Sequence, residues 1–256
     1  MEKLILLDLD GTLLHDDKTI SDESVSVLKQ CQASGMLLGF STARGESNIQ
    51  PFLARVEPDI VISSGGALAK YHGETVYACL LSESETCALI EAGRRVTGGS
   101  CEITVDTLDG HYWNYKEHPK ALDSTWGDVI HTDYADFWQK ALKVCIELPS
   151  PEAAEEAAAA IEACDYAKFS DGDWYKFTRA GATKEHAIQA LGAYLGLLPE
   201  EMIAFGDDYG DIEMLRYCGK GIAVANAIPE VRAIADEIAG SNNQDGVARY
   251  LADHYL

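Results

Sequence analysis

The stretch LILLDLDGT, residues 4–12, is the part of the sequence that decides the fold. Its first half, Leu4–Leu7, is apolar at every position, which is typical of a central strand buried on both faces of a parallel sheet. Asp8 and Asp10 follow where this strand ends, and ligands of open α/β sheets bind at the carboxyl ends of strands. The stretch therefore predicts a functional site. The plain alternative is a strand that runs into an acidic turn bent at Gly11.

Alternating strands and helices extend outward from this strand. Ser21 predicts the N-cap of a helix that runs to about Ser34, and apolar strands follow at Met36–Phe40 and Ile60–Ile62. After an interruption the alternation resumes with helices and strands at 184–195, 202–205, 211–217 and 221–225. We expect an α/β fold with a doubly wound, mainly parallel, Rossmann-like sheet.

The interruption has a different pattern, with a helix from Ser82, antiparallel strands and an alanine-rich helix over Pro151–Cys164. This predicts an inserted α+β domain over residues 82–179, within a core formed by residues 1–81 and 180–256.

A second acidic group follows another apolar strand. Residues 203–211 read IAFGDDYGD, so the chain delivers Asp207, Asp208 and Asp211 at a second strand end. Taken alone, these acids also fit a solvated loop in which Asp211 caps the next helix. Desolvating a carboxylate such as Asp8 costs several kcal/mol unless a cation pairs with it. The two acidic groups therefore predict a compensating cation.

Two further positions fit a site for a phosphate group. Lys184 stands at the predicted start of a helix, where a positive charge is electrostatically misplaced unless an anion lies beside it. Thr42 ends another strand, and its hydroxyl group with the following backbone amides, beginning at Ala43, suits phosphate oxygens.

Taken in order, these segments resemble the signature of the haloacid dehalogenase superfamily of aspartate phosphotransferases. Within it, the chain looks like the Cof-type sugar-phosphatase group, because of Thr42–Arg44, the long insertion, and the closing segments Ala223–Ala227 and Ser241–Val247. The four motifs that carry the resemblance are residues 8–12, Thr42, Lys184, and 206–207 with Asp211.

The resemblance implies a Mg²⁺-dependent phosphoric monoester hydrolase that acts on small phosphorylated metabolites, most of all sugar phosphates. Asp8 would be the nucleophile, and Asp10 the acid and base. Thr12, Thr42, Ala43 and Lys184 would bind the phosphoryl group, with Thr42 and Lys184 also taking part in catalysis. The metal ligands would be Asp8, the backbone carbonyl of Asp10, and Asp207, with Asp211 orienting a metal water.

Three positions depart from the group's pattern. Ala43 and Gly65 stand where the group often has glycine and asparagine, and Gly210 replaces an asparagine. These changes put efficiency and substrate preference in question more than the class of reaction.

Two other functions use the same residues. A phosphomutase would also use Asp8 but return the phosphoryl group to its substrate. A non-enzymatic receiver-like phosphoacceptor would need neither Asp10 nor an inserted domain. The aromatic residues of the insertion either line a substrate pocket or form a core, and these are Trp113, Tyr115, Trp126, Trp174 and Tyr175.

Composition excludes several classes of partner. The 256 residues carry a formal net charge of −22, which repels nucleic acid and anionic membrane. No apolar run approaches the ~18 residues that span a bilayer. Seven cysteines without paired spacing, and an amino terminus unlike a signal peptide, lead us to expect a cytoplasmic protein with reduced thiols.

Overall fold

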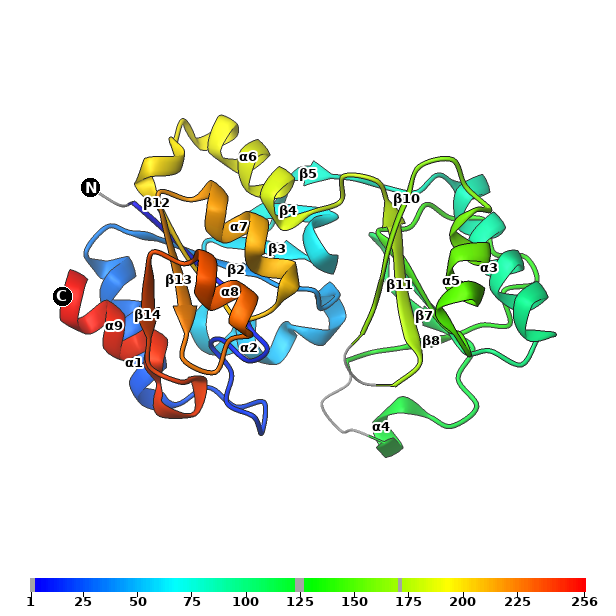
Figure 1. The fold of residues 1–256 in the computed structure, drawn as a ribbon, viewed down its shortest axis with the longest axis horizontal. Helices are drawn as coiled ribbons and strands as arrows, with labels where there is room; N and C mark the ends of the chain where they lie inside the picture. Colours follow the sequence, from blue (N-terminus) through cyan, green and yellow to red (C-terminus); the bar gives the residue numbers. More distant parts are fainter. Residues whose placement is uncertain (1–2, 123–126, 170–171) are drawn as a thin grey trace. The chain divides into compact units, whose positions relative to one another are not determined.

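The computed structural model describes residues 3–122, 127–169 and 172–256. Its contacts divide the chain into two compact units (Figure 1). The first comprises Met1–Arg44, Pro51–Tyr77 and Thr183–Leu256, and the second Gly45–Gln50 and Ala78–Ala182. The sequence assigned residues 45–50 to the core, whereas their contacts place them in the second unit. The domain boundaries at 82 and 179 stay a prediction.

The first unit contains an eight-stranded, mainly parallel sheet. β1 lies at its centre, parallel to β2 and β12, and all four of its side chains are fully buried. The order is β14 (Glu237–Ala239), β13 (Lys220–Val224), β12 (Met202–Gly206), β1 (Leu4–Leu7), β2 (Leu37–Ser41), β3 (Ile60–Ser63), β4 (Leu68–Tyr71) and β5 (Glu74–Ala78). Toward the β5 edge the direction changes, since β4 runs antiparallel to its neighbour β3.

Helices pack on this sheet in two groups. One group is α1 (Asp22–Ala33) and α9 (Gly246–Tyr255), which contact each other. The other is α6 (Lys184–Leu195), α7 (Ile212–Tyr217) and α8 (Pro229–Ile234). The remaining helix, α2, spans Gln50–Val56. Ser21 caps α1 by accepting a hydrogen bond from the Ser24 amide, as expected from the sequence.

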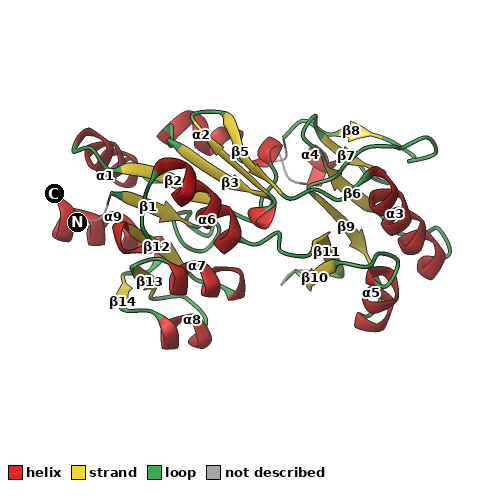
Figure 2. Ribbon diagram, turned by 90° about the horizontal axis from the view of Figure 1, so that it is seen from above, coloured by secondary structure: helices red, strands yellow, loops and turns green. Residues whose placement is uncertain are grey.

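The second unit contains a six-stranded sheet whose pairs are antiparallel except for β7 with β8. Its order is β10 (Cys164–Lys168), β11 (Trp174–Arg179), β9 (Lys143–Glu147), β6 (Ile103–Asp106), β7 (His111–Trp113) and β8 (Ile130–His131). Helices α3 (Glu83–Thr97) and α5 (Pro151–Ala158) share one hydrophobic core with this sheet, and α4 spans Pro119–Leu122 (Figure 2). The fold class expected from the sequence is confirmed.

The predicted end of one helix is wrong. The alanine-rich helix α5 stops at Ala158 and not at Cys164, since Cys164 already pairs with Arg179 in the β10–β11 ladder. Tertiary pairing thus overrides the high helix propensity of alanine here.

All seven cysteines are free thiols. Within the described ranges, the helices are too short or too polar to cross a membrane.

Candidate active site

Neighbouring strands deliver the predicted site residues to one edge of the central sheet. Asp8 follows β1, and its amide still donates to the Phe205 carbonyl of β12 at 3.1 Å. Asp207 follows β12, and Lys184 is the first residue of α6. Because parallel strands end at the same edge, residues almost 200 positions apart are brought together.

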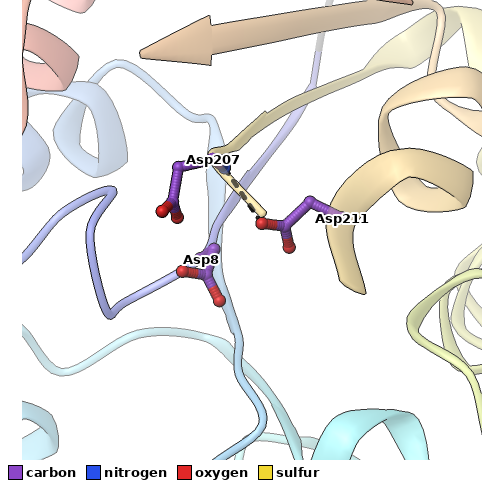
Figure 3. A group of neighbouring side chains, drawn as sticks. All are labelled: Asp8, Asp207 and Asp211. Atoms are coloured by element: carbon purple, nitrogen blue, oxygen red, sulfur yellow. Dashed lines mark hydrogen bonds between the residues drawn. The ribbon is translucent and has the colours of Figure 1, made fainter. Parts of the chain in front are cut away.

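Asp8, Asp207 and Asp211 form a compact acidic group (Figure 3). One carboxylate oxygen from each lies within 4.8 Å of the others. The Lys184 ammonium donates to Asp8 Oδ1 and to Asp211 Oδ1, each at 2.6 Å. The other oxygen of Asp211 accepts the Asp207 and Asp208 amides at 3.0 and 3.2 Å. Asp211 is thereby held in place by three donors.

Burial makes this concentration of charge costly. It raises the pKa of Asp8 well above its ordinary value, and the carboxylates of Asp211 and Asp207 raise it further against the effect of Lys184. Burial and the neighbouring carboxylates likewise raise the pKa of Asp207 to about 6. Burial alone would lower the pKa of Lys184, but the carboxylates of Asp211 and Asp8 raise it, so this lysine is charged.

The donor set fits a divalent cation. Three carboxylates face one ammonium, which leaves two negative charges to be compensated when all three acids are ionised. Carboxylate oxygens are the ligands that hard cations such as Mg²⁺ prefer. The three aspartates can therefore hold a metal ion, and its charge would offset the repulsion that adds to burial in raising the pKa values of Asp8 and Asp207.

The carboxylate of Asp10 lies among different partners. It accepts from Arg44 Nε at 2.5 Å, from Arg44 Nη2 at 2.7 Å and from Lys18 Nζ at 2.9 Å. Partial burial would raise the pKa of Asp10, but the hydrogen bonds and charges of Arg44 and Lys18 hold it below its ordinary value. Asp10 is thus a carboxylate at neutral pH in this arrangement, and it must leave these cations to carry a proton.

Arg44 and Lys18 were not assigned roles from the sequence. Arg44 belongs to the segment Thr42–Arg44, which carries part of the family resemblance. A partly buried acid such as Asp10 also needs a cation, so the sequence did contain a signal for the role of Arg44. Lys18 lies in the loop before α1, where nothing in the sequence distinguishes it from a solvated lysine.

The residues predicted to bind phosphate are placed as follows. Thr42 is buried, and its hydroxyl group accepts a hydrogen bond from the Arg44 amide at 3.1 Å. Ala43 lies exposed between these two residues. The Thr12 hydroxyl donates to Asp207 Oδ1 at 2.7 Å, so this side chain orients a carboxylate. Phosphate binding by Thr12, Thr42 and Ala43 stays a prediction.

Two of the departures from the family pattern have local explanations. Gly65 has φ of 72°, a left-handed conformation that glycine adopts freely and asparagine better than most other residues. A Cβ atom at Gly210 would meet no atom within 4 Å, so glycine is not required there for space.

The aromatic candidates of the second unit divide into two groups. Tyr175 is buried in the hydrophobic core shared with α3 and α5. Trp113 and Trp174 contact each other edge to face with ring centroids 5.9 Å apart, and Tyr115 contacts Trp113. Trp126 lies outside the described residues.

The raised pKa of Asp207 predicts an unusual pH dependence of stability for Asp207→Asn in EDTA. A group whose pKa is higher in the folded than in the unfolded protein stabilises the fold at pH values below its unfolded-state pKa. This contribution is lost as the pH rises through the folded-state pKa. For Asp207 the stability should therefore change between about pH 4 and about pH 6. We expect wild type and variant to melt alike at pH 4, and the variant to melt at a higher temperature by pH 7.

Thermal unfolding with excess EDTA checks this, with the exposed Asp253→Asn as the matched control. If the melting temperature of wild type instead rises above that of the variant between pH 4 and pH 7, the pKa of Asp207 is not raised in the folded protein. Excess Mg²⁺ should reverse the order at pH 7, because only wild type retains the full acidic group.

An open, doubly wound sheet that gathers carboxylates and a lysine at its strand ends defines an α/β protein whose candidate site lies where such sheets bind ligands. The chain belongs to the haloacid dehalogenase-like hydrolase family, whose family model matches residues 5–251. The resemblance to this superfamily and its Cof-type group is thus confirmed.

Individual relatives match over nearly their whole length. A 5-amino-6-(5-phospho-D-ribitylamino)uracil phosphatase of Bacillus subtilis strain 168 is 26% identical, with 98% of this chain and 97% of that protein covered. A haloacid dehalogenase-like hydrolase structure from Bacteroides thetaiotaomicron has a TM-score of 0.87 at 23% identity, covering 100% of both chains. A sugar phosphatase of subclass IIB of the superfamily has a TM-score of 0.83 at 21% identity, covering 98% of each.

Proposed function

We propose that the chain is a Mg²⁺-dependent phosphatase that hydrolyses small phosphorylated metabolites, most of all sugar phosphates, through a phosphoryl group carried on Asp8. The observation that carries the proposal is the buried contact of Asp8 with Lys184, beside Asp207 and Asp211. The family supports hydrolysis, and the relative from Bacillus subtilis is named as a phosphatase of 5-amino-6-(5-phospho-D-ribitylamino)uracil, a small phosphate ester.

Each group of the site has a part in this reaction. Asp8 attacks phosphorus and forms an acyl-phosphate, while the leaving oxygen takes a proton from Asp10. Asp10, now a carboxylate, takes a proton from the water that attacks the acyl-phosphate. Lys184 offsets the negative charge shared by Asp8 and the transferring group, because phosphoryl transfer depends chiefly on positioning and charge compensation.

The metal ion would be held by the carboxylates of Asp8 and Asp207 and the backbone carbonyl of Asp10, with Asp211 orienting one of its waters. Bound there, Mg²⁺ supplies positive charge to the phosphate oxygens. Thr42 and the amide of Ala43 would bind the remaining oxygens.

The contacts of Asp10 add a condition to this scheme. Arg44 and Lys18 keep it ionised, yet the first step needs it protonated. We infer that a phosphate ester draws one or both cations away from Asp10, which lets the pKa of Asp10 rise when substrate binds.

Rapid acid quenching tests the covalent step, because it should trap phosphate on the peptide that contains Asp8. Single turnover in water labelled with ¹⁸O then shows where water attacks the acyl-phosphate: attack at phosphorus places the label in inorganic phosphate, and attack at the acyl carbon places it on Asp8. A peptide without phosphate, at a time when product is forming, would remove the covalent route.

The two other functions predict different products. A phosphomutase would return the phosphoryl group to an isomeric ester and release little inorganic phosphate. A receiver-like phosphoacceptor would accumulate phosphoprotein without turnover. A panel of phosphorylated metabolites, assayed for phosphate release and for isomerised ester, separates these outcomes and identifies the substrate.

Asp10→Asn tests the acid and base role. With an alkyl phosphate, we expect formation and breakdown of the phosphoenzyme each to slow by about 10²- to 10⁴-fold. With p-nitrophenyl phosphate, whose leaving group needs no proton, only breakdown should slow, so a burst of nitrophenolate should precede a slow steady rate. Rapid-quench kinetics measure both phases.

Asp17→Asn is the matched control, since Asp17 is an exposed acid in the same loop whose carboxylate accepts hydrogen bonds from Thr19. Its two rates should equal those of wild type. An Asp10→Asn enzyme with wild-type steady turnover of the alkyl ester would rule out the assigned role.

A further inference from the structure

Two segments singled out in the sequence have no part in the proposed chemistry. Residues 223–227 form the end of β13 and the turn after it, and residues 241–247 follow β14. Both belong to the first unit, and both send side chains to the loop that follows β1. Their contacts point to a role in holding that loop.

Asn226 connects the two segments with the loop. Its Nδ2 donates to the Gly11 carbonyl at 2.7 Å, and its Oδ1 accepts the Asn242 amide at 3.0 Å. An amide side chain holds its donor nitrogen and its acceptor oxygen at fixed separation, so both bonds are made by the same planar group. Asn226 thus fixes the orientation of the Gly11–Thr12 peptide.

This peptide lies directly against a predicted metal ligand. Gly11 has φ of 83°, and a methyl group in place of its hydrogen would overlap Asp207 Oδ2. The next residue, Thr12, donates to Asp207 Oδ1 at 2.7 Å. The position of the Gly11–Thr12 peptide therefore decides how the Asp207 carboxylate is oriented.

These hydrogen bonds form a closed ring that begins and ends at Asp207. The turn that carries Asn226 is itself bonded to Asp207, since the Ile228 amide donates to the Asp207 carbonyl at 2.9 Å. Asn226 then reaches Gly11, and Thr12 returns to the Asp207 side chain. Removing the Asn226 donor opens the ring at the Gly11 carbonyl.

The other end of the loop is anchored by further side chains. Buried Asn242 donates to the Leu14 carbonyl and to Asp16 Oδ1, each at 3.0 Å. Asp245 accepts from the hydroxyl groups of Ser21 and Ser24 at 2.6 and 2.8 Å. Loss of Asn226 should consequently disturb residues 10–12 without unfolding the whole loop.

We propose that Asn226 is a positioning residue that orients the Asp207 carboxylate for the metal ion by holding the Gly11 carbonyl. This inference rests on the proposed function, because it assumes that the acidic group binds a divalent cation. It assigns a task to a side chain that touches neither the reacting atoms nor the three aspartates.

Asn226→Asp gives the sharpest test. The substitution keeps the shape and the acceptor for Asn242 but replaces the donor with an oxygen that repels the Gly11 carbonyl. It also adds a negative charge near the site, which on long-range electrostatics alone would strengthen the binding of a cation. A weaker affinity for the metal ion would therefore result from a changed position of the Gly11–Thr12 peptide and not from the added charge.

We expect Mg²⁺ binding, measured by calorimetry without substrate, to weaken about fivefold or more, which is the range of one lost hydrogen bond. The half-saturating Mg²⁺ concentration for turnover should rise by the same factor, while KM for the ester at saturating Mg²⁺ stays within about twofold of wild type.

Asn114→Asp is the matched control. Asn114 also bridges two backbone groups, because it donates to the Cys101 carbonyl at 3.1 Å and accepts the Ile103 amide at 2.5 Å. It lies in the second unit, so its loss of a donor should leave the affinity for Mg²⁺ unchanged.

The outcomes separate this inference from the proposed function. Wild type and Asn226→Asp with equal Mg²⁺ affinities would overturn the role of Asn226 and leave the proposed function standing. Wild type that binds no divalent cation would overturn both. Should Asn226→Asp fail to fold by circular dichroism, Asn226→Ala decides by the same titration. It removes the donor to Gly11 without repulsion, together with the acceptor of the Asn242 amide, and equal affinities would again overturn the role.

Discussion

Asp8→Asn should abolish Mg²⁺-dependent hydrolysis of p-nitrophenyl phosphate, with turnover falling by about 10⁴-fold or more, the scale on which loss of a nucleophile is felt in other hydrolases. An amide at this position has the shape of the carboxylate but cannot attack phosphorus to form the acyl-phosphate. Phosphate release from the purified variant, with saturating Mg²⁺, measures the loss.

The same substitution should not harm the fold. Burial raises the pKa of Asp8, so the ionised carboxylate is an unfavourable form in the folded, metal-free protein. A neutral amide relieves that cost, while Lys184 keeps Asp211 as a partner. We therefore expect Asp8→Asn to melt in EDTA at pH 7 no lower than wild type.

Asp22→Asn controls for the substitution itself, because the Asp22 side chain is wholly exposed. It should retain full activity. An Asp8→Asn protein that is folded and turns over at a rate near that of wild type would exclude covalent catalysis by Asp8, whatever the other residues do.

Much of the core could be predicted because its signals are local and strong. The uninterrupted apolar run of β1 and the side-chain cap at Ser21 mark elements that the structure contains. Parallel pairing then brings strand ends together, which is how Asp8 and Asp207 were expected to meet. The unusual position of Lys184 at a helix start correctly indicated nearby anions.

Other features depend on contacts that leave no local pattern. Short strands such as β8 and β14 have two and three residues, too few for a periodic signal. The contacts of residues 45–50 with the second unit are tertiary, as is the clamp of Asp10 by Arg44 and Lys18. Sequence spacing could suggest which acids meet, but it could not show which cations hold them before substrate binds.

Lys184→Met should have the second large effect, on both stability and activity. The variant removes the ammonium that lies 2.6 Å from two buried carboxylates and leaves three acids together. Breaking a buried ion pair by removing one partner costs roughly 3–5 kcal/mol, because the remaining charge is uncompensated. Turnover should fall by about 10³-fold, since charge offset for the phosphoryl group is lost as well.

The dependence on pH and on Mg²⁺ distinguishes the loss of charge compensation in Lys184→Met from a general destabilisation of the fold. In EDTA at pH 7, we expect Lys184→Met to melt well below wild type, and the gap should narrow toward pH 5, where the acids of the group with raised pKa values take up protons. Saturating Mg²⁺ should also narrow the gap, because a divalent cation replaces the missing positive charge. Calorimetric melting curves across this pH range give the comparison.

Two further variants complete the test. Lys29→Met, at an exposed lysine whose ammonium lies 4.0 Å from Glu57 Oε2, should match wild type in melting temperature and rate. Lys184→Arg restores the charge with a larger, forked group, so it should recover part of the stability but little turnover. If Lys184→Met melts with wild type in EDTA at pH 7, the lysine does not compensate the buried aspartates, and the electrostatic basis of the site is wrong.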